Sequence, residues 1–147
     1  MCAGPHVIDS GPGMLTTMNL PRLVLADDHT DTRNQMACLL EQEFDVIACV
    51  GDGQELIRAA ELLSPDVIVT DISMPRLNGI AAAAVIRRKD PAVRIVFVTI
   101  HDDPMIMERA FAAGGVGFVR KGAAGDELLP AVHSALRGRP GARAKNS

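Results

Sequence analysis

The sequence predicts an α/β fold, a single domain in which five parallel strands alternate with five helices as (βα)5. Three observations support this prediction. Short runs of Val, Ile, Leu and Ala recur along the chain, and their continuous apolar character is typical of strands covered on both faces. Segments with helical apolar spacing or composition separate these runs. Crossovers of that length require parallel pairing with right-handed connections. A doubly wound sheet of five strands then predicts the flavodoxin-like strand order 2-1-3-4-5.

The predicted elements follow one another in regular alternation. The strands are RLVLAD (22–27), DVIACV (45–50), DVIVTD (66–71), RIVFVT (94–99) and VGFVRK (116–121). The helices cover residues 31–43, 54–63, 79–89, 104–113 and 126–137. Four of these helices carry an apolar stripe. The third is rich in Ala, so its prediction depends on intrinsic helix propensity instead.

Helix boundaries are marked by residues with restricted or unusual backbone preferences. Asp103 before Pro104 combines an N-cap with a first-turn proline and so predicts a helix start. The prolines after Ser64 and Asp90 end the preceding helices, because the residue before a proline avoids the helical conformation. The glycine pair that begins at Gly114 predicts a left-handed C-cap.

The two ends of the chain lack apolar periodicity. Residues 1–20 are rich in Gly, Pro, Ser and Thr and are expected to form a disordered leader. Residues 139–147 are expected to form a linker-like basic tail. The net charge is −3, although four basic residues and no acid lie between 137 and 147, so the rest of the chain is strongly acidic. An acidic body argues against direct binding of nucleic acid by this domain.

The chain is expected to be cytoplasmic. It has no stretch of membrane-spanning length, and its first residues lack the apolar run of a signal peptide. Cys38 and Cys49 show no metal-ligand spacing and fall in an apolar helix stripe and an apolar strand. They are therefore expected to be buried thiols in a reducing compartment.

Polar side chains stand where four of the predicted strands end. Asp27 and Asp28 close the first strand, Asp71 the third, Thr99 the fourth and Lys121 the fifth. The functional crevice of an open α/β sheet lies beyond the carboxyl ends of its strands, so these groups are expected to converge. Taken singly, each has an ordinary explanation, such as a helix N-cap or a solvated charge. Their combination at four strand ends, however, indicates a functional site.

Three clustered carboxylates repel one another unless a cation compensates their charge. Oxygen ligands that leave positions for water and phosphate suit Mg²⁺. A carboxylate beside Mg²⁺, with a hydroxyl and an ammonium nearby, has the parts needed for phosphoryl transfer through an acyl phosphate. The strand ends therefore predict a magnesium-dependent phosphoryl site.

Residues 22–138 resemble the receiver domain of two-component response regulators, most closely the NarL/FixJ-like subfamily. The segments that carry the resemblance are LVLADDHTDTR, DVIVTDISMPRLNG, VFVTIHDD and GVGFVRK. The resemblance implies that residues 21–138 form a receiver domain. It also implies that Asp71 is the phosphoacceptor, that Asp28 binds Mg²⁺ directly, and that Asp27 acts on the ion indirectly. The backbone carbonyl of Ser73 is implied as a further metal ligand.

The same resemblance implies roles for residues on the later strands. Thr99 and Lys121 are expected to hold phosphoryl oxygens, and Phe118 to be the aromatic residue whose rotamer follows Thr99. Ser73 and His101 occupy positions that tune how fast the acyl phosphate hydrolyses in the family.

The implied partner is a sensor histidine kinase that donates a phosphoryl group from phosphohistidine. The domain is then not an enzyme in the ordinary sense but a switch that supports its own Mg²⁺-dependent phosphotransfer and autodephosphorylation. Its output is expected to be control of transcription through a helix-turn-helix DNA-binding domain that is absent from this chain. The sequence leaves open whether the domain forms a homodimer.

Three alternatives remain beside the receiver interpretation. The strongest is a nonphosphorylated pseudo-receiver that serves as a docking module, against which the complete set of Asp, Thr and Lys argues. A flavin or nucleotide binder of the same fold is disfavoured by the scarcity of aromatic residues, with no Trp and no Tyr. A haloacid-dehalogenase-type phosphatase needs a second Asp where Ser73 stands.

Overall fold

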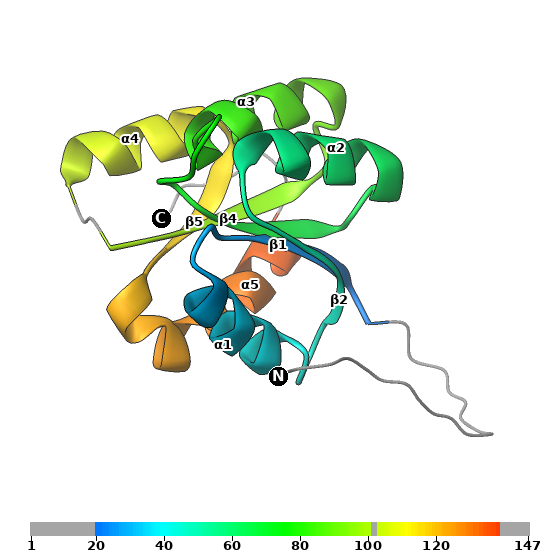
Figure 1. Cartoon of the computed structure of the whole chain (residues 1–147), viewed down its shortest axis with the longest axis vertical. Coiled ribbons are helices and arrows are strands. Elements are labelled where there is room, and N and C mark those ends of the chain that lie inside the picture. The colour runs from blue at the N-terminus through cyan, green and yellow to red at the C-terminus, as the bar shows by residue number, and fades with distance from the viewer. Residues whose placement is uncertain (1–19, 101–102, 139–147) are drawn as a thin grey trace.

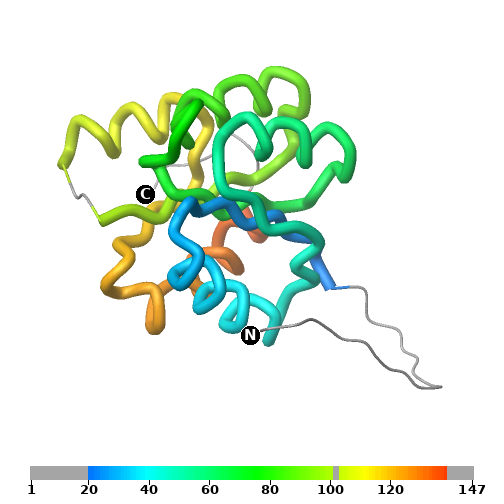
Figure 2. Tube along the Cα trace, viewed as in Figure 1, coloured from blue at the N-terminus to red at the C-terminus, as the bar shows by residue number. Residues whose placement is uncertain are grey.

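Parallel pairing of neighbouring strands organises the structure, a computed structural model that describes residues 20–100 and 103–138. Its five strands form one sheet in the order β2-β1-β3-β4-β5, and each neighbouring pair is parallel. Helices α2, α3 and α4 cover one face of this sheet, and α1 and α5 cover the other (Figures 1 and 2). The predicted doubly wound fold and strand order are confirmed.

The strands are β1 (Arg22–Ala26), β2 (Asp45–Val50), β3 (Val67–Asp71), β4 (Arg94–Thr99) and β5 (Gly115–Arg120). The helices are α1 (Thr30–Leu40), α2 (Gly53–Leu63), α3 (Gly79–Lys89), α4 (Pro104–Ala112) and α5 (Ala124–Arg137), with a short 3-10 turn, η1 (Lys121–Ala123), before α5. Several boundaries differ from prediction by one or two residues, and the end of α1 differs by three. Helix α1 ends at Leu40, because the chain tightens into a turn that brings the buried Phe44 into the core. Lys121 begins η1 instead of ending the last strand.

The sheet separates two aliphatic cores. Alternate residues of β1 contribute to them in turn, with Leu23 and Leu25 in the core beneath α1 and α5. Val24 and Ala26 lie in the core beneath α2, α3 and α4. All four side chains are fully buried, as the continuous apolar run predicts for a central strand. The strand ends are thereby fixed on a rigid support.

The predicted helix caps are present. The Asp103 side chain accepts a hydrogen bond from the Met105 amide at 2.9 Å, with Pro104 in the first turn. Gly114 follows α4 with a φ of +112°, in the left-handed region that favours glycine. Ser64 ends α2 in the same region, with a φ of 47°.

The prediction of buried cysteines is wrong, because Cys38 and Cys49 are both exposed. In α1 the core-facing positions are taken by Met36, Ala37 and Leu40, which leaves Cys38 on the solvent side. Cys49 lies on β2, an edge strand whose residues are exposed or half-buried throughout. Among the described residues, no helix is long and apolar enough to cross a membrane.

Candidate functional site

The polar groups predicted at the strand ends meet at one edge of the sheet. Asp27 follows β1, Asp71 ends β3 and Thr99 ends β4, and all three are buried. Lys121 follows β5 directly. Because β1, β3, β4 and β5 are consecutive in the sheet, these side chains lie side by side.

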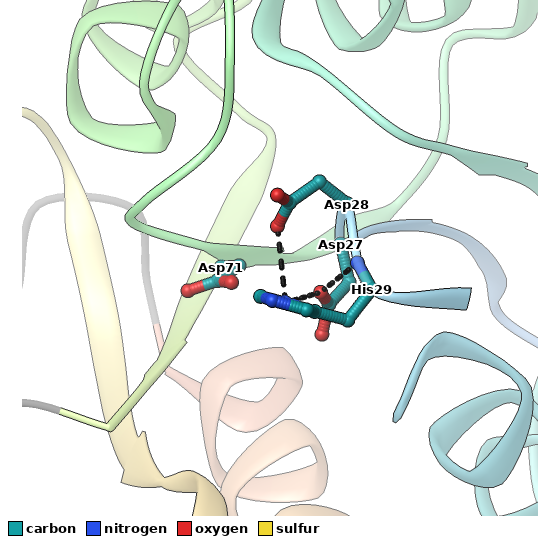
Figure 3. A group of neighbouring side chains, drawn as sticks. All are labelled: Asp27, Asp28, His29 and Asp71. Carbon is teal, nitrogen blue, oxygen red and sulfur yellow. Dashed lines mark hydrogen bonds and ion pairs between the residues drawn. The ribbon is translucent and has the colours of Figure 1, made fainter. Parts of the chain in front are cut away.

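An acidic cluster forms the centre of this edge (Figure 3). Asp27, Asp28, Asp71 and His29 each offer one ligand atom, and these atoms lie within 4.8 Å of one another. The His29 Nδ1 is 3.2 Å from the Asp28 Oδ1 and 3.5 Å from the Asp27 Oδ1. Sequence reasoning did not assign His29 to the site, although its place directly after the acid pair was a usable signal.

Lys121 joins two of the carboxylates. Its Nζ lies 2.9 Å from the Oδ2 of Asp27 and 2.9 Å from the Oδ2 of Asp71. Burial lowers the pKa of Lys121, but the hydrogen bonds to Asp27 and Asp71 outweigh this and raise it above its ordinary value. The ammonium group is therefore retained and holds the ends of β1, β3 and β5 together.

The negative charge at this edge exceeds what Lys121 neutralises. Burial raises the pKa of Asp71, an effect that the hydrogen bond from Lys121 only partly offsets. The Oδ2 of Asp27 is buried, and its partner among the described residues is the ammonium group that it shares with Asp71. Clustered carboxylates whose charge a single ammonium group does not balance fit a hard divalent cation such as Mg²⁺.

The loop between β3 and α3 lies against the carboxylate of Asp71. The Ser73 amide donates to the Oδ1 of Asp71 at 3.3 Å. The Gly79 amide donates to the Ile72 carbonyl at 2.8 Å and closes the loop at its base. A Cβ on Gly79 would lie 2.0 Å from the Asp71 carbonyl oxygen, so this close approach requires glycine.

The remaining predicted residues lie at or behind the same edge. Thr99 is fully buried at the end of β4. Phe118 lies on β5 beside Phe97 of β4 and is half-buried, with its ring centroid 6.3 Å from that of Phe111 in α4. His101 falls outside the described residues. The structure thus brings the acids, Thr99 and Lys121 together and places Phe118 beside α4.

Comparison with known proteins gives one consistent match. The model of the response regulator receiver domain family matches residues 23–133. The chain is 33% identical over 122 residues to the transcriptional regulatory protein DegU of Brevibacillus brevis, which covers 82% of this chain and 52% of that protein. It is 36% identical over 129 residues to the transcriptional regulatory protein PdtaR of Mycobacterium tuberculosis, which covers 86% of this chain and 62% of that protein.

A solved structure shows the same likeness. A two-component response regulator of the LuxR family from Aurantimonas sp. SI85-9A1 superposes with a TM-score of 0.78 at 34% identity, over 83% of this chain and 89% of that one. The chain spans between one half and two thirds of the length of the curated relatives described above. The family model, the relatives and the acidic edge of the sheet agree: the chain belongs to the receiver domain family of two-component response regulators.

Proposed function

We propose that this receiver domain is a phosphorylation-controlled switch in which Asp71 accepts a phosphoryl group from the phosphohistidine of a sensor kinase. The observation that carries the proposal is the placement of Lys121, whose Nζ is 2.9 Å from the carboxylates of both Asp27 and Asp71. An ammonium group held beside the acceptor can stabilise the charge on a transferring phosphoryl group. A pseudo-receiver that only docks to partners has no need of this arrangement.

The transfer consists of one bond made and one broken. A carboxylate oxygen of Asp71 attacks the donor phosphorus, and a new P–O bond produces an acyl phosphate. The P–N bond of the phosphohistidine breaks, and its electron pair stays on the imidazole nitrogen. Lys121 and the Thr99 hydroxyl hold the phosphoryl oxygens, while Ser73 and His101 set the lifetime of the acyl phosphate. The chain would therefore be a phosphoacceptor that also supports its own dephosphorylation.

The acidic cluster would hold Mg²⁺. Asp28, Asp71 and the Ser73 backbone carbonyl are the proposed ligands, and Asp27 acts indirectly. When bound, the ion supplies positive charge to the phosphoryl oxygens.

The proposed output depends on a change in the face formed by α4, β5 and α5. Thr99 moves toward the phosphoryl group, and Phe118 follows it, which shifts an equilibrium between two arrangements of that face. The names of DegU and PdtaR as transcriptional regulatory proteins support control of transcription as the output. A helix-turn-helix domain beyond residues 21–138 would then act on DNA in the cytoplasm, with 1–20 and 139–147 as leader and linker.

Self-phosphorylation tests this proposal. The purified chain, incubated with acetyl phosphate and Mg²⁺, is expected to gain one phosphoryl group in intact-mass spectrometry. EDTA is expected to prevent the gain, because the acidic cluster then lacks its compensating cation. A chain that stays unmodified with both acetyl phosphate and a panel of phosphorylated histidine kinases would favour the pseudo-receiver.

Asp28 should govern the response of the fold to Mg²⁺. A ligand bound only by the native state stabilises it by RT ln(1 + [L]/Kd), so Mg²⁺ at ten times its Kd adds about 1.4 kcal/mol. We expect the melting temperature of the wild type to rise with millimolar Mg²⁺. Asp28→Asn should melt at a higher temperature without metal, because one repelling charge is removed, and should respond much less to Mg²⁺. Equal responses of the two proteins in thermal melts would remove Asp28 from the ligand set.

A further inference from the structure

Arg76 adopts an unusual backbone conformation in the loop between β3 and α3. Its φ is 66°, and it is one of two residues other than glycine with a positive φ in the described part of the chain. For a residue with a Cβ, the left-handed region is disfavoured, because the Cβ comes too close to the following carbonyl oxygen. Such a conformation persists only where the surrounding structure holds it.

An ion pair with Asp52 holds Arg76 in place. The Arg76 Nε donates to the Oδ2 of Asp52 at 3.0 Å. Asp52 is only 3% exposed, although the Arg76 side chain is 64% exposed. A carboxylate buried to this extent needs its partners, so the loss of Arg76 would leave charge without compensation at that position.

Asp52 is itself rigidly fixed. It is the N-cap of α2, and its Oδ1 accepts a hydrogen bond from the Glu55 amide at 2.8 Å. That backbone hydrogen bond is the main reason that the pKa of Asp52 is lowered, and the hydrogen bond from Arg76 lowers it further. The next residue, Gly53, lies so close to the loop that a Cβ on it would be 2.1 Å from the Leu77 carbonyl oxygen. The loop therefore rests directly on the first turn of α2.

The loop that Arg76 anchors is the one that carries the phosphoryl site. Its base is closed by the Gly79 amide on the Ile72 carbonyl, and its tip is held by the ion pair between Arg76 and Asp52. Ser73 lies between these two anchors and donates its amide to Asp71. With only the base anchor, the backbone around Ser73 could move relative to the acceptor carboxylate.

We propose that Asp52 and Arg76 are positioning residues of the phosphoryl site, which act through the loop that follows Asp71 and contains Ser73. Neither side chain contacts the acceptor carboxylate among the interactions described, so their effect passes through the backbone of residues 72–78. This inference rests on the proposed function for its kinetic consequences. Its consequence for the Ser73 amide is independent of phosphorylation.

The chain supplies a matched control for this pair. A second ion pair joins the same two helical regions at the end far from the site, between Glu61 of α2 and Lys89 of α3. Both of its side chains are exposed, at 46% and 59%. Exposed ion pairs contribute little to stability, so Lys89→Ala removes an inter-helix ion pair without touching the loop.

Two substitutions separate positioning from folding. Arg76→Gly removes the ion pair and also relieves the backbone strain of a positive φ, which offsets part of the cost of leaving Asp52 without its partner, so only a modest fall in the melting temperature is expected. Asp52→Asn keeps a good N-cap and removes the charge. In both variants we expect acetyl phosphate to phosphorylate Asp71 about tenfold more slowly, because small misplacements of reacting groups have large kinetic effects.

Three measurements decide the proposal. Intact-mass time courses should show the slower phosphorylation, and calorimetric titration should show weaker Mg²⁺ binding. Hydrogen exchange at the Ser73 amide should become faster. The double variant Asp52→Asn/Arg76→Gly should be no slower than either single variant, since both remove one interaction. Lys89→Ala should match the wild type in all three.

The outcomes distinguish this inference from the proposed function. If the wild-type protein takes up no phosphoryl group, the proposed function is wrong. Hydrogen exchange at the Ser73 amide in the variants then still tests whether the ion pair positions the loop. Unchanged Ser73 exchange in Arg76→Gly and Asp52→Asn overturns the inference. An equal loss in Lys89→Ala also overturns it, since that result would assign the effect to packing between the helices.

Discussion

Asp71→Asn is expected to abolish phosphorylation completely and to leave the fold intact. An amide of nearly the same shape cannot act as the nucleophile that forms an acyl phosphate. Intact-mass spectrometry after incubation with acetyl phosphate and Mg²⁺ should show no added phosphoryl group. The exposed Asp126 of α5 provides the control, because Asp126→Asn should be phosphorylated like the wild type. Phosphate retained on Asp71→Asn would show that another residue is the acceptor.

The same substitution should stabilise the metal-free protein in a pH-dependent way. Burial raises the pKa of Asp71 above its ordinary value of 3.8. Between the unfolded and folded pKa values the native state binds more protons, so wild-type stability falls as pH rises through that range. The advantage of Asp71→Asn should therefore be absent below about pH 3.8 and should grow until the folded pKa is passed.

Thermal melts in EDTA across this range provide the measurement. In a domain of this size, a gain of about 1 kcal/mol corresponds to about 4 °C in the melting temperature. An advantage that shrinks with rising pH would mean that the Asp71 carboxylate is stabilised in the fold, which contradicts the direction of its pKa shift.

Gly79→Ala should severely disturb both the fold and the site. The new Cβ would lie 2.0 Å from the Asp71 carbonyl oxygen and 3.1 Å from the Thr70 Oγ1, so the backbone of β3 and the start of α3 must separate. Overpacking at such a contact costs about 3 kcal/mol, which lowers the melting temperature by roughly 12 °C. Phosphorylation of any protein that remains folded should be strongly reduced, because Asp71 is the residue displaced.

Gly125→Ala is the matched control for this substitution. Gly125 lies in the first turn of α5, and a Cβ there would meet nothing within 4 Å. Alanine is the better helix former by about 1 kcal/mol, so this variant should melt at the same temperature or higher. A Gly79→Ala protein with wild-type melting temperature and phosphorylation rate would show that the contact between Gly79 and Asp71 relaxes without cost.

The sequence alone determined the fold and the location of the site. Continuous apolar runs identify buried parallel strands, because such strands are covered on both faces and cannot alternate. The right-handed crossover then leaves few topologies, and all of them place the carboxyl ends of the strands at one edge. For that reason Asp27, Asp71, Thr99 and Lys121 could be assigned to one site from their places at strand ends, and the structure brings them together.

Tertiary structure alone decided which side chains meet across elements. Cys49 is exposed although the predicted strand order already placed its strand at the sheet edge, because the extent to which the helices cover an edge strand depends on how they pack. The ion pair between Asp52 and Arg76 joins residues 24 positions apart, and its geometry depends on a left-handed residue that sequence propensity disfavours. Periodicity reports the face on which a residue lies. Contacts between loops depend on how two elements pack, which is a property of the whole fold and not of either segment.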